Sequence, residues 1–361
     1  MRRRFRWCSL REALLFVVSA VVLAEVAGSA AIAQGEDPAS LTGQVRERLE
    51  PLLEHFPGLS VAIARGGELV VSSALGWADL EGRSPATSDS RYLVHSAAKA
   101  WTAAAAVSLL EQGRLRMDTE VAALVSAWPE SHPPITVIQL ATHTSGIRHY
   151  RDDDEARNPG HCTTVAEALP IFAADPLVGA PGGGENYSSW GFVLLSAAVE
   201  AASGSSFDAT LRERVLEPAG MTSTVHADPV REVASRAIPY RKTGEGGFDP
   251  VERLDPSCKW GAGGYLSTAE DLVRFYLALL DRRLVSAESI ELLLRGAPVV
   301  RFGGSSDGGR SQILVDRERG VIAAIAANAR GEEVDLHGVL VELVELIELV
   351  PSSAGETPPA P

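Results

Sequence analysis

A serine and a lysine three positions apart, Ser96 and Lys99, are the residues of this sequence best suited to covalent chemistry. Three of the 33 basic residues are lysines, so a lysine kept here suggests a task that arginine cannot perform. Arginine stays protonated at any accessible pH, whereas a desolvated lysine can lose its proton. Residues three apart on a helix lie on one face. The pair can therefore act as a nucleophile and the amine that activates it.

The segment that must position this pair, residues 96–112, is rich in alanine and apolar on nearly every face, and Gly113 follows it. A helix that is apolar all round is a buried one. We therefore expect a central helix that begins at Ser96, where the helix dipole favours developing negative charge.

The elements of a sheet come from both ends of the chain. Apolar runs flank the turn segments 65–67 and 316–320, which is typical of β-hairpins. Helical spacing of apolar residues marks 268–280 and 336–347. This order favours an α/β (α+β) fold, with a sheet assembled from both chain ends and helices on both faces. The expected strands are 59–64, 68–73, 312–315 and 321–326.

The motifs around Ser96 resemble those of the serine β-lactamase and penicillin-binding-protein superfamily, in which a Ser-x-x-Lys sequence opens a helix. Segments 57–62, 139–150 and 259–272 are similar to further parts of its class C-like branch, and especially to the mitochondrial serine β-lactamase-like family. The resemblance implies a central antiparallel sheet with helices on both faces plus an all-helical insert. It implies one hydrolase domain at 34–350, with a sheet part at about 40–115 and 265–350 and a helical part at about 116–264.

The second motif of the superfamily, usually Tyr-x-Asn in this branch, matches at Tyr187, and Ser189 stands at the asparagine position. The resemblance implies that Ser96 attacks a carbonyl, Lys99 takes its proton and Tyr187 relays a proton to the leaving group. Ser189 can still form a hydrogen bond, with a shorter reach than asparagine.

The third motif, usually Lys-Thr-Gly or His-x-Gly on a strand beside the nucleophile, matches less closely. We expect it at Arg301, followed by Gly303 and Gly304, with Arg301 binding a substrate carboxylate or steadying Tyr187. The literal tripeptide 242–244 comes too early in the chain to be this strand. By analogy, the backbone N–H groups of Ser96 and Gly304 form the oxyanion hole. The segment before the motif, 292–298, is shorter than in the family.

Two functions follow from this pattern. The first is an exported serine hydrolase that acts through an acyl-enzyme on an amide or ester, such as a β-lactam, a D-amino-acid peptide, another peptide or an ester. The second is a catalytically weakened or inactive protein of the same fold that serves as a binding or scaffold protein. Ser189, Arg301 and the short segment 292–298 favour the second, whereas Ser96, Lys99 and Tyr187 favour the first.

The N-terminal residues 1–33 have a basic start, an apolar run and an Ala-x-Ala end, which predicts a cleaved export signal. The protein is then periplasmic or extracellular, with no membrane span after cleavage, and 351–361 is a disordered tail. The net charge of −14 argues against nucleic acid as a partner and leaves a small molecule or peptide as the substrate. Cys162 and Cys258 either pair or stay as buried thiols.

Other polar residues have structural interpretations. His143 and His149 are expected to brace a loop, and Lys259 is either a contact at the rim of the site or a surface cation. The acidic run 152–155, between His149 and His161, is typical of a solvated loop rather than a metal site. The resemblance implies no metal and no organic cofactor.

Overall fold

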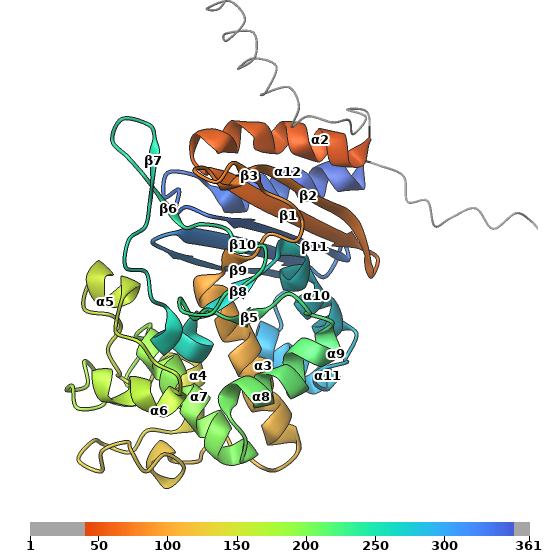
Figure 1. Ribbon diagram of the computed structural model, residues 1–361. Helices are drawn as coiled ribbons and strands as arrows, with labels where there is room; N and C mark the ends of the chain where they lie inside the picture. Colours follow the sequence, from red (N-terminus) through yellow and green to blue (C-terminus); the bar gives the residue numbers. More distant parts are fainter. Residues whose placement is uncertain (1–39, 350–361) are drawn as a thin grey trace, which may run out of the picture.

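The computed structural model describes residues 40–349, and across them a six-stranded antiparallel sheet has the strand order β3-β2-β1-β11-β10-β9. Two hairpins supply most of it, β1–β2 and β10–β11, so the prediction of strands from both chain ends is confirmed (Figure 1). The central pair is β1 and β11, in which Val61 lies opposite Ile325. The strands are β1 (Gly58–Arg65), β2 (Glu68–Asp79), β3 (Ser84–Pro85), β9 (Val299–Ser306), β10 (Gly309–Asp316) and β11 (Val321–Ala327).

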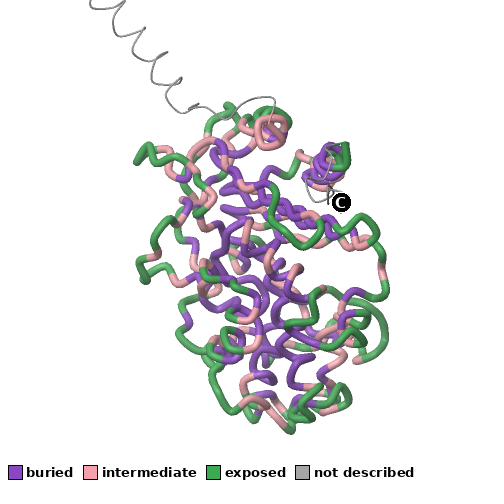
Figure 2. The backbone as a smooth tube through the Cα atoms, turned by 90° about the vertical axis from the view of Figure 1, so that its right-hand side faces the viewer, coloured by how far each residue is buried: buried purple, intermediate pink, exposed green. Residues whose placement is uncertain are grey.

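Each face of the sheet is covered by helices, because side chains alternate along the strands and both sets are apolar. On the outer face, α2 (Leu41–Leu49) and α12 (Leu336–Glu348) pack on a cluster that includes Leu314 and Ala323. On the inner face, α3 (Lys99–Glu111) and α10 (Ala269–Leu280) pack on a second cluster that includes Ile313 and Ala324. Figure 2 shows the buried backbone running through the middle of the molecule.

The central helix is the predicted alanine-rich one, preceded by a turn of 3-10 helix, η2 (His95–Ala98). Small side chains such as Ala104 and Ala105 let neighbouring elements approach the helix closely, and both residues are fully buried. Ser96 therefore lies in the 3-10 turn at the start of the helix, and Lys99 is the first residue of α3.

Between α3 and β8 (Tyr265–Ser267) the chain consists mainly of short helices joined by long loops, so the insert is not all-helical as expected. A three-stranded sheet of order β4-β8-β5 and the hairpin β6–β7 accompany its helices. The short strands are β4 (Tyr92–Leu93), β5 (Val225–His226), β6 (Tyr240–Lys242) and β7 (Phe248–Pro250). The longest helix of the segment is α7 (Ser189–Ser203), and the others are α4 (Val137–Ala141), α5 (Asp153–Arg157), α6 (Val165–Ala168), α8 (Phe207–Leu211) and α9 (Glu217–Ala219). The helix α11 (Ala287–Leu294) leads into β9.

Cys162 and Cys258 form a disulfide that joins a loop before α6 to the 3-10 segment η6 (Ser257–Ala262). The sequence left this pairing open. Within residues 40–349, no helix is long and apolar enough to cross a membrane. The predicted export signal and C-terminal tail lie outside the described residues.

Loss of this disulfide is expected to destabilise the fold, because the bridge closes a loop between residues 96 positions apart in the sequence. Removal of a native disulfide typically costs about 2–5 kcal/mol, mainly through the entropy of the unfolded chain. The measurement is the free energy of unfolding in denaturant for the double variant Cys162→Ser/Cys258→Ser. An unchanged free energy of unfolding would contradict the expectation.

Candidate active site

The hydroxyl of Ser96 lies within hydrogen-bond distance of two other side chains that the sequence singled out. Lys99 Nζ donates to Ser96 Oγ at 3.1 Å, and Tyr187 Oη lies 2.7 Å from the same oxygen. Ser96 and Lys99 come from one helical turn, while Tyr187 comes from the loop that leads into α7. The tertiary fold therefore brings together residues 91 positions apart.

Lys99 is 2% exposed, and its amine donates hydrogen bonds to three oxygen atoms. Besides Ser96, its Nζ donates to Ser189 Oγ at 3.1 Å and to the backbone oxygen of Ala262 at 2.6 Å. Ser189 thus occupies the place that the motif gives to asparagine. A neutral amine keeps two protons, which can serve Ser189 and Ala262 and leave its lone pair facing the Ser96 hydroxyl. The arrangement suits a base that takes the proton of Ser96.

Electrostatics favours proton transfer among these groups. Burial lowers the pKa of Lys99, although Tyr187 acts in the opposite direction. Burial by itself raises the pKa of Tyr187, but the charge of Lys99 and hydrogen bonds from Lys99, Ser96 and Ser189 outweigh it and lower that pKa overall. Two groups with converging pKa values beside one hydroxyl are typical of acid–base chemistry.

Two histidines fix the loop that carries Tyr187. Nδ1 of His143 accepts the backbone N–H of Ser188, and Nδ1 of His149 accepts that of Ser189, both at 3.2 Å. Their ring centroids lie 4.5 and 5.1 Å from that of Tyr187. Burial and the charge of Lys99 lower the pKa of both to about 4, so they are neutral acceptors at pH 7. The prediction that they brace a loop is confirmed.

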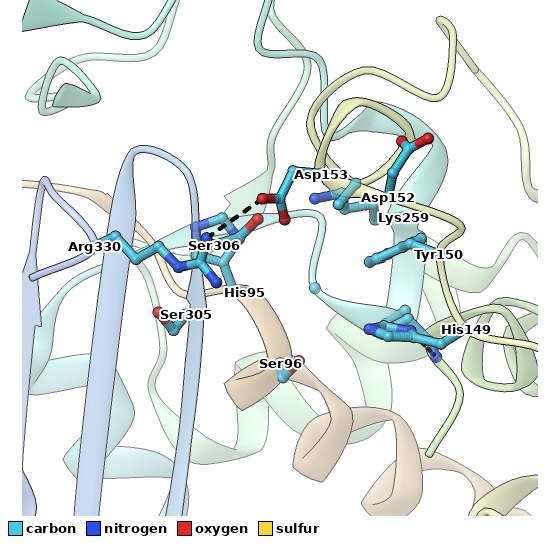
Figure 3. A pocket seen from close by; sticks show the side chains of 14 residues that line it. His95, Ser96, His149, Tyr150, Asp152, Asp153, Lys259, Ser305, Ser306 and Arg330 are labelled. Carbon is cyan, nitrogen blue, oxygen red and sulfur yellow. Dashed lines mark hydrogen bonds and ion pairs between the residues drawn. The ribbon is translucent and has the colours of Figure 1, made fainter. Parts of the chain in front are cut away.

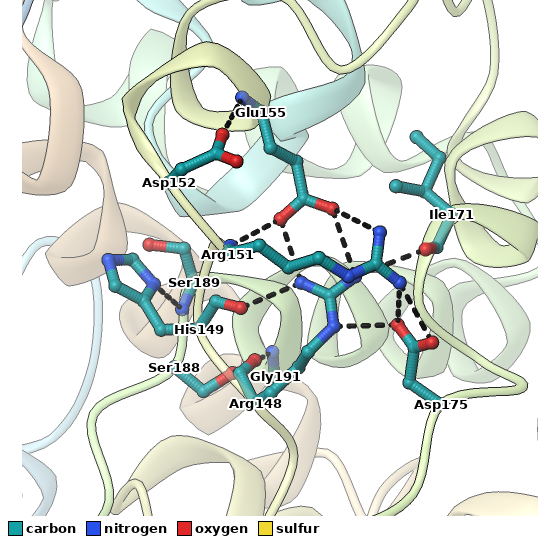
Figure 4. Close-up of polar contacts among 10 residues, drawn as sticks. All are labelled: Arg148, His149, Arg151, Asp152, Glu155, Ile171, Asp175, Ser188, Ser189 and Gly191. Carbon is teal, nitrogen blue, oxygen red and sulfur yellow. Dashed lines mark hydrogen bonds and ion pairs between the residues drawn. The ribbon is translucent and has the colours of Figure 1, made fainter.

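In the acidic run 152–155 the three aspartates are exposed, as expected for a solvated segment, whereas Glu155 joins a partly buried ion-pair network behind this loop. Arg148 donates to both oxygens of Glu155 and, at 2.6 Å, to Asp175 (Figure 4). Ser188 caps α7 by accepting the N–H of Gly191 and donates to the Arg148 backbone oxygen at 2.7 Å. The network therefore ties the α5 region to the start of α7. Among residues 40–349 no group of three potential ligands is placed to hold a metal ion.

The third motif lies on the edge strand β9, as the sequence predicted, but in a different orientation. Arg301 pairs with Leu314 of the outer cluster, and Phe302 pairs with Ile313 of the inner cluster. Directly paired residues share a face of the sheet. Arg301 therefore lies on the face opposite Ser96, exposed to solvent, and Phe302 lies on the Ser96 side. The structure does not bring Arg301 to the other predicted site residues, because strand register rather than motif order decides the face.

Replacement of Arg301 by alanine is expected to change the rate of covalent labelling of Ser96 by less than about twofold, since substitutions of exposed residues away from a site have small effects. The rate is measured with a fluorophosphonate probe at several concentrations. A tenfold loss of rate would show that Arg301 acts in the site after all.

Gly304 is the residue of β9 that meets the start of the central helix. A Cβ at this position would lie 2.1 Å from the Val94 oxygen, 2.5 Å from the Ser96 nitrogen and 2.9 Å from the Ala97 nitrogen. Ser311 of the neighbouring strand β10 contacts the same segment, because its hydroxyl donates to the Val94 oxygen at 2.8 Å. The backbone of β9 therefore runs directly beside the Ser96 N–H. Gly303, on the opposite face, approaches Ser311 and Gln312 instead.

Ser96 opens into a cavity of about 470 Å³ between β9 and the insert, within the range typical of small-molecule sites. Figure 3 shows Ser305 and Arg330 on one wall and His149, Tyr150 and Lys259 on the other. Lys259 is 2% exposed, so it is neither a rim nor a surface residue. The scarcity of lysine was the signal that could have identified it. Sequence reasoning also had no means to find the backbone oxygen of Ala262 as a partner of Lys99.

The tripeptide 242–244 lies in the β6–β7 hairpin, as expected for a sequence that is not the third motif. Lys242 forms an ion pair with Glu333 at 3.0 Å.

Comparison with known proteins finds relatives of this chain in sequence and in fold. A penicillin-binding protein 4 from Amycolatopsis lactamdurans is 28% identical, over 78% of this chain and 84% of its own length. The human mitochondrial serine beta-lactamase-like protein LACTB is 27% identical over 62% of this chain, which spans about half the length of that relative. A penicillin-binding protein from Bacillus halodurans has a similar fold, with a TM-score of 0.72 at 22% identity, over 84% of this chain and 98% of that one.

The family model described as beta-lactamase matches residues 45–299 and ends where β9 begins. That match covers Ser96, Lys99, Tyr187 and Ser189 and leaves the third motif outside. Since it spans more than half of the sequence, the chain belongs to the beta-lactamase family.

Proposed function

We propose that the protein is an exported serine hydrolase that cleaves an amide or ester through an acyl-enzyme. The observation that carries this proposal is that one hydroxyl, that of Ser96, contacts both a buried lysine and a tyrosine with a lowered pKa. Membership of the beta-lactamase family supports it. Structures of similar fold include a D-amino acid amidase from Ochrobactrum anthropi, with a TM-score of 0.72 at 21% identity over 86% of this chain and 98% of that one.

In the proposed reaction, neutral Lys99 takes the proton of Ser96 as Ser96 Oγ bonds to the substrate carbonyl carbon. The oxyanion would be held by the Ser96 N–H and a backbone N–H of β9 near Gly304. The proton passes through Tyr187 to the leaving nitrogen or oxygen as its bond to the carbonyl carbon breaks. Water then attacks the carbonyl carbon of the Ser96 ester and gives up a proton to the same pair of groups. That proton returns to Ser96 Oγ as the bond between Oγ and the acyl carbon breaks, which releases the acid and restores the free hydroxyl.

Export is supported by the leader pattern at 1–33 and by the disulfide between Cys162 and Cys258, because disulfides persist in oxidising compartments.

The alternative, a binding or scaffold protein on the same fold, draws support from β9, which presents Phe302 rather than a cation on the Ser96 side. Covalent labelling separates the two functions. A hydrolase should react with a fluorophosphonate or a penicillin probe, and the adduct should map to Ser96. Ser96→Ala should abolish labelling, while the exposed control Ser205→Ala should retain it. Absence of labelling by both probes in the unmodified protein would reject the hydrolase and leave the binding function.

A further inference from the structure

The amine of Lys99 is held by a backbone atom as well as by side chains. Its shortest hydrogen bond, at 2.6 Å, goes to the oxygen of Ala262, the last residue of η6. Substitution cannot remove a backbone oxygen, so the position of that oxygen depends on whatever fixes the course of η6. Residues that fix this segment can therefore act on Lys99 without touching the substrate.

The backbone of η6 is strained at Trp260, two residues before Ala262. Its φ of 31° and ψ of −130° form a conformation that residues with a side chain rarely adopt. Such outliers persist only where the surrounding structure imposes them, and they gather at functional sites. The residues that line the cavity include Ala262 and Gly263 but not Trp260, which is 7% exposed. The strain therefore concerns the path of the backbone rather than a direct contact with a ligand.

The Trp260 side chain is held by two contacts, one of them with His226 of β5. Its Nε1 donates to the backbone oxygen of Thr164 at 3.0 Å. The ring of His226 stacks on the indole, with centroids 4.0 Å apart and planes 8° from parallel. Nε2 of His226 also donates to the backbone oxygen of Ser257 at 2.9 Å. One side chain thus contacts both the first residue of η6 and its strained residue.

The protonation of His226 suits this double contact. Burial lowers the pKa of its ring, so the ring is neutral at pH 7 and carries one proton. That proton lies on Nε2, because the Ser257 oxygen can only accept.

The other end of η6 leads to the reacting groups. The Gly261 oxygen accepts from Thr102 Oγ1 of α3 at 2.8 Å. A Cβ on Gly263 would lie 2.8 Å from the backbone carbon of His95, the residue before Ser96. The segment therefore touches both the central helix and the turn that carries the nucleophile, so a shift of η6 reaches both of them.

We infer that His226 is a positioning residue of the proposed hydrolase. By holding Trp260 and the start of η6, it aims the Ala262 oxygen at Lys99. The lone pair of that amine then faces the Ser96 hydroxyl. This inference rests on the proposed function and adds to it a residue that acts through the base rather than on the substrate.

The chain offers a matched control in His132, which makes the same two kinds of contact outside η6. The ring of His132 stacks on Trp128, with centroids 4.8 Å apart, and its Nε2 donates to the backbone oxygen of Ala173 at 2.8 Å. Both histidines are partly buried. His226→Ala and His132→Ala therefore remove equivalent contacts from two different parts of the insert.

The experiment follows the Lys99 amine by NMR of protein whose lysines carry carbon-13 at Cε, and the reaction by the rate of fluorophosphonate labelling. The sequence has three lysines, so Lys99→Met identifies the signal of Lys99 among three. His226→Ala should shift that signal and lower the labelling rate by about 10- to 100-fold, since a displacement of about 1 Å can cost about 10²-fold. His226→Phe, which keeps a stacked ring, should recover most of the rate. His132→Ala should change neither the signal nor the rate.

Thermal unfolding of each variant measures the stability that is lost, and His226→Gln replaces the alanine variant if that one does not fold. If His226→Ala loses stability but keeps the Lys99 signal and the labelling rate, His226 serves packing alone, and the inference is wrong while the hydrolase stands. A slower rate with an unmoved Lys99 signal would also contradict the positioning role, because the effect would not pass through Lys99. If the probe labels no form of the protein, the proposed function fails and the inference fails with it.

Discussion

Replacement of Lys99 by arginine is expected to lower the rate of Ser96 acylation by about 10²- to 10⁴-fold, the usual contribution of a general base. Arginine keeps the positive charge but cannot release its proton at any accessible pH. Lys99→Met removes both charge and base and should lose at least as much. The measurement is the second-order rate of labelling by a fluorophosphonate, with circular dichroism to show that each variant is folded.

The control for this pair is Lys242→Arg, which retains an ion pair with Glu333 and should label at the rate of the unmodified protein. A Lys99→Arg variant that labels at the normal rate would show that Lys99 is not the base and would move that role to Tyr187.

The same assignment predicts a pH dependence with a definite sign. Because burial lowers the pKa of Lys99, its neutral form becomes available below the ordinary lysine range. The labelling rate should therefore rise with pH and reach a plateau at a pH below 10.5, the ordinary lysine value. Since Lys99 and Tyr187 interact directly, the midpoint belongs to the pair rather than to one residue. A rate that falls with rising pH in the range where Lys99→Met is flat would contradict the assignment.

The second large effect is expected at Gly304, where alanine should lower the labelling rate by about 10²- to 10³-fold, as loss of one oxyanion donor does. The added Cβ would overlap the Val94 oxygen and the Ser96 nitrogen, and both atoms belong to the backbone. The clash is relieved only if β9 moves away from the nucleophile, so the N–H groups of the two elements no longer converge.

Gly244→Ala is the matched control, because a Cβ there meets nothing within 4 Å and the backbone does not require glycine. Thermal unfolding separates the two consequences of the Gly304 change. A variant with a lowered midpoint but a normal labelling rate would show that Gly304 serves packing alone and that the oxyanion hole lies elsewhere.

Much of the fold followed from local sequence patterns. The β1–β2 and β10–β11 hairpins were predicted from apolar runs around short polar turns, and α10 and α12 from helical spacing. The short strands of the insert were missed because a two- or three-residue strand has too few positions to show an alternating pattern. The sequence could not decide whether Cys162 and Cys258 form a disulfide, because two cysteines 96 positions apart carry no information about their distance in space.

The residues of the candidate site also divide into those that local sequence patterns predict and those that depend on the tertiary fold. Ser96 and Lys99 could be paired from sequence because one helical turn fixes their separation. The helix that follows could be predicted to be buried because it is apolar on nearly every face. Tyr187 could be named from a motif, but its contact with Ser96 depends on how the insert folds back onto α3. The orientation of Arg301 could not be predicted, because a shift of one residue in a strand moves every side chain to the other face.

By itself, then, the sequence determined the pairing of Ser96 with Lys99 and the class of fold, since these depend on residue type and on spacing within single elements. The tertiary structure decided which groups surround them. It placed the Ala262 oxygen on Lys99, turned Arg301 away from the cavity and buried Lys259 inside it. These outcomes depend on strand register and on contacts between segments far apart in the chain, and no local pattern encodes either of them.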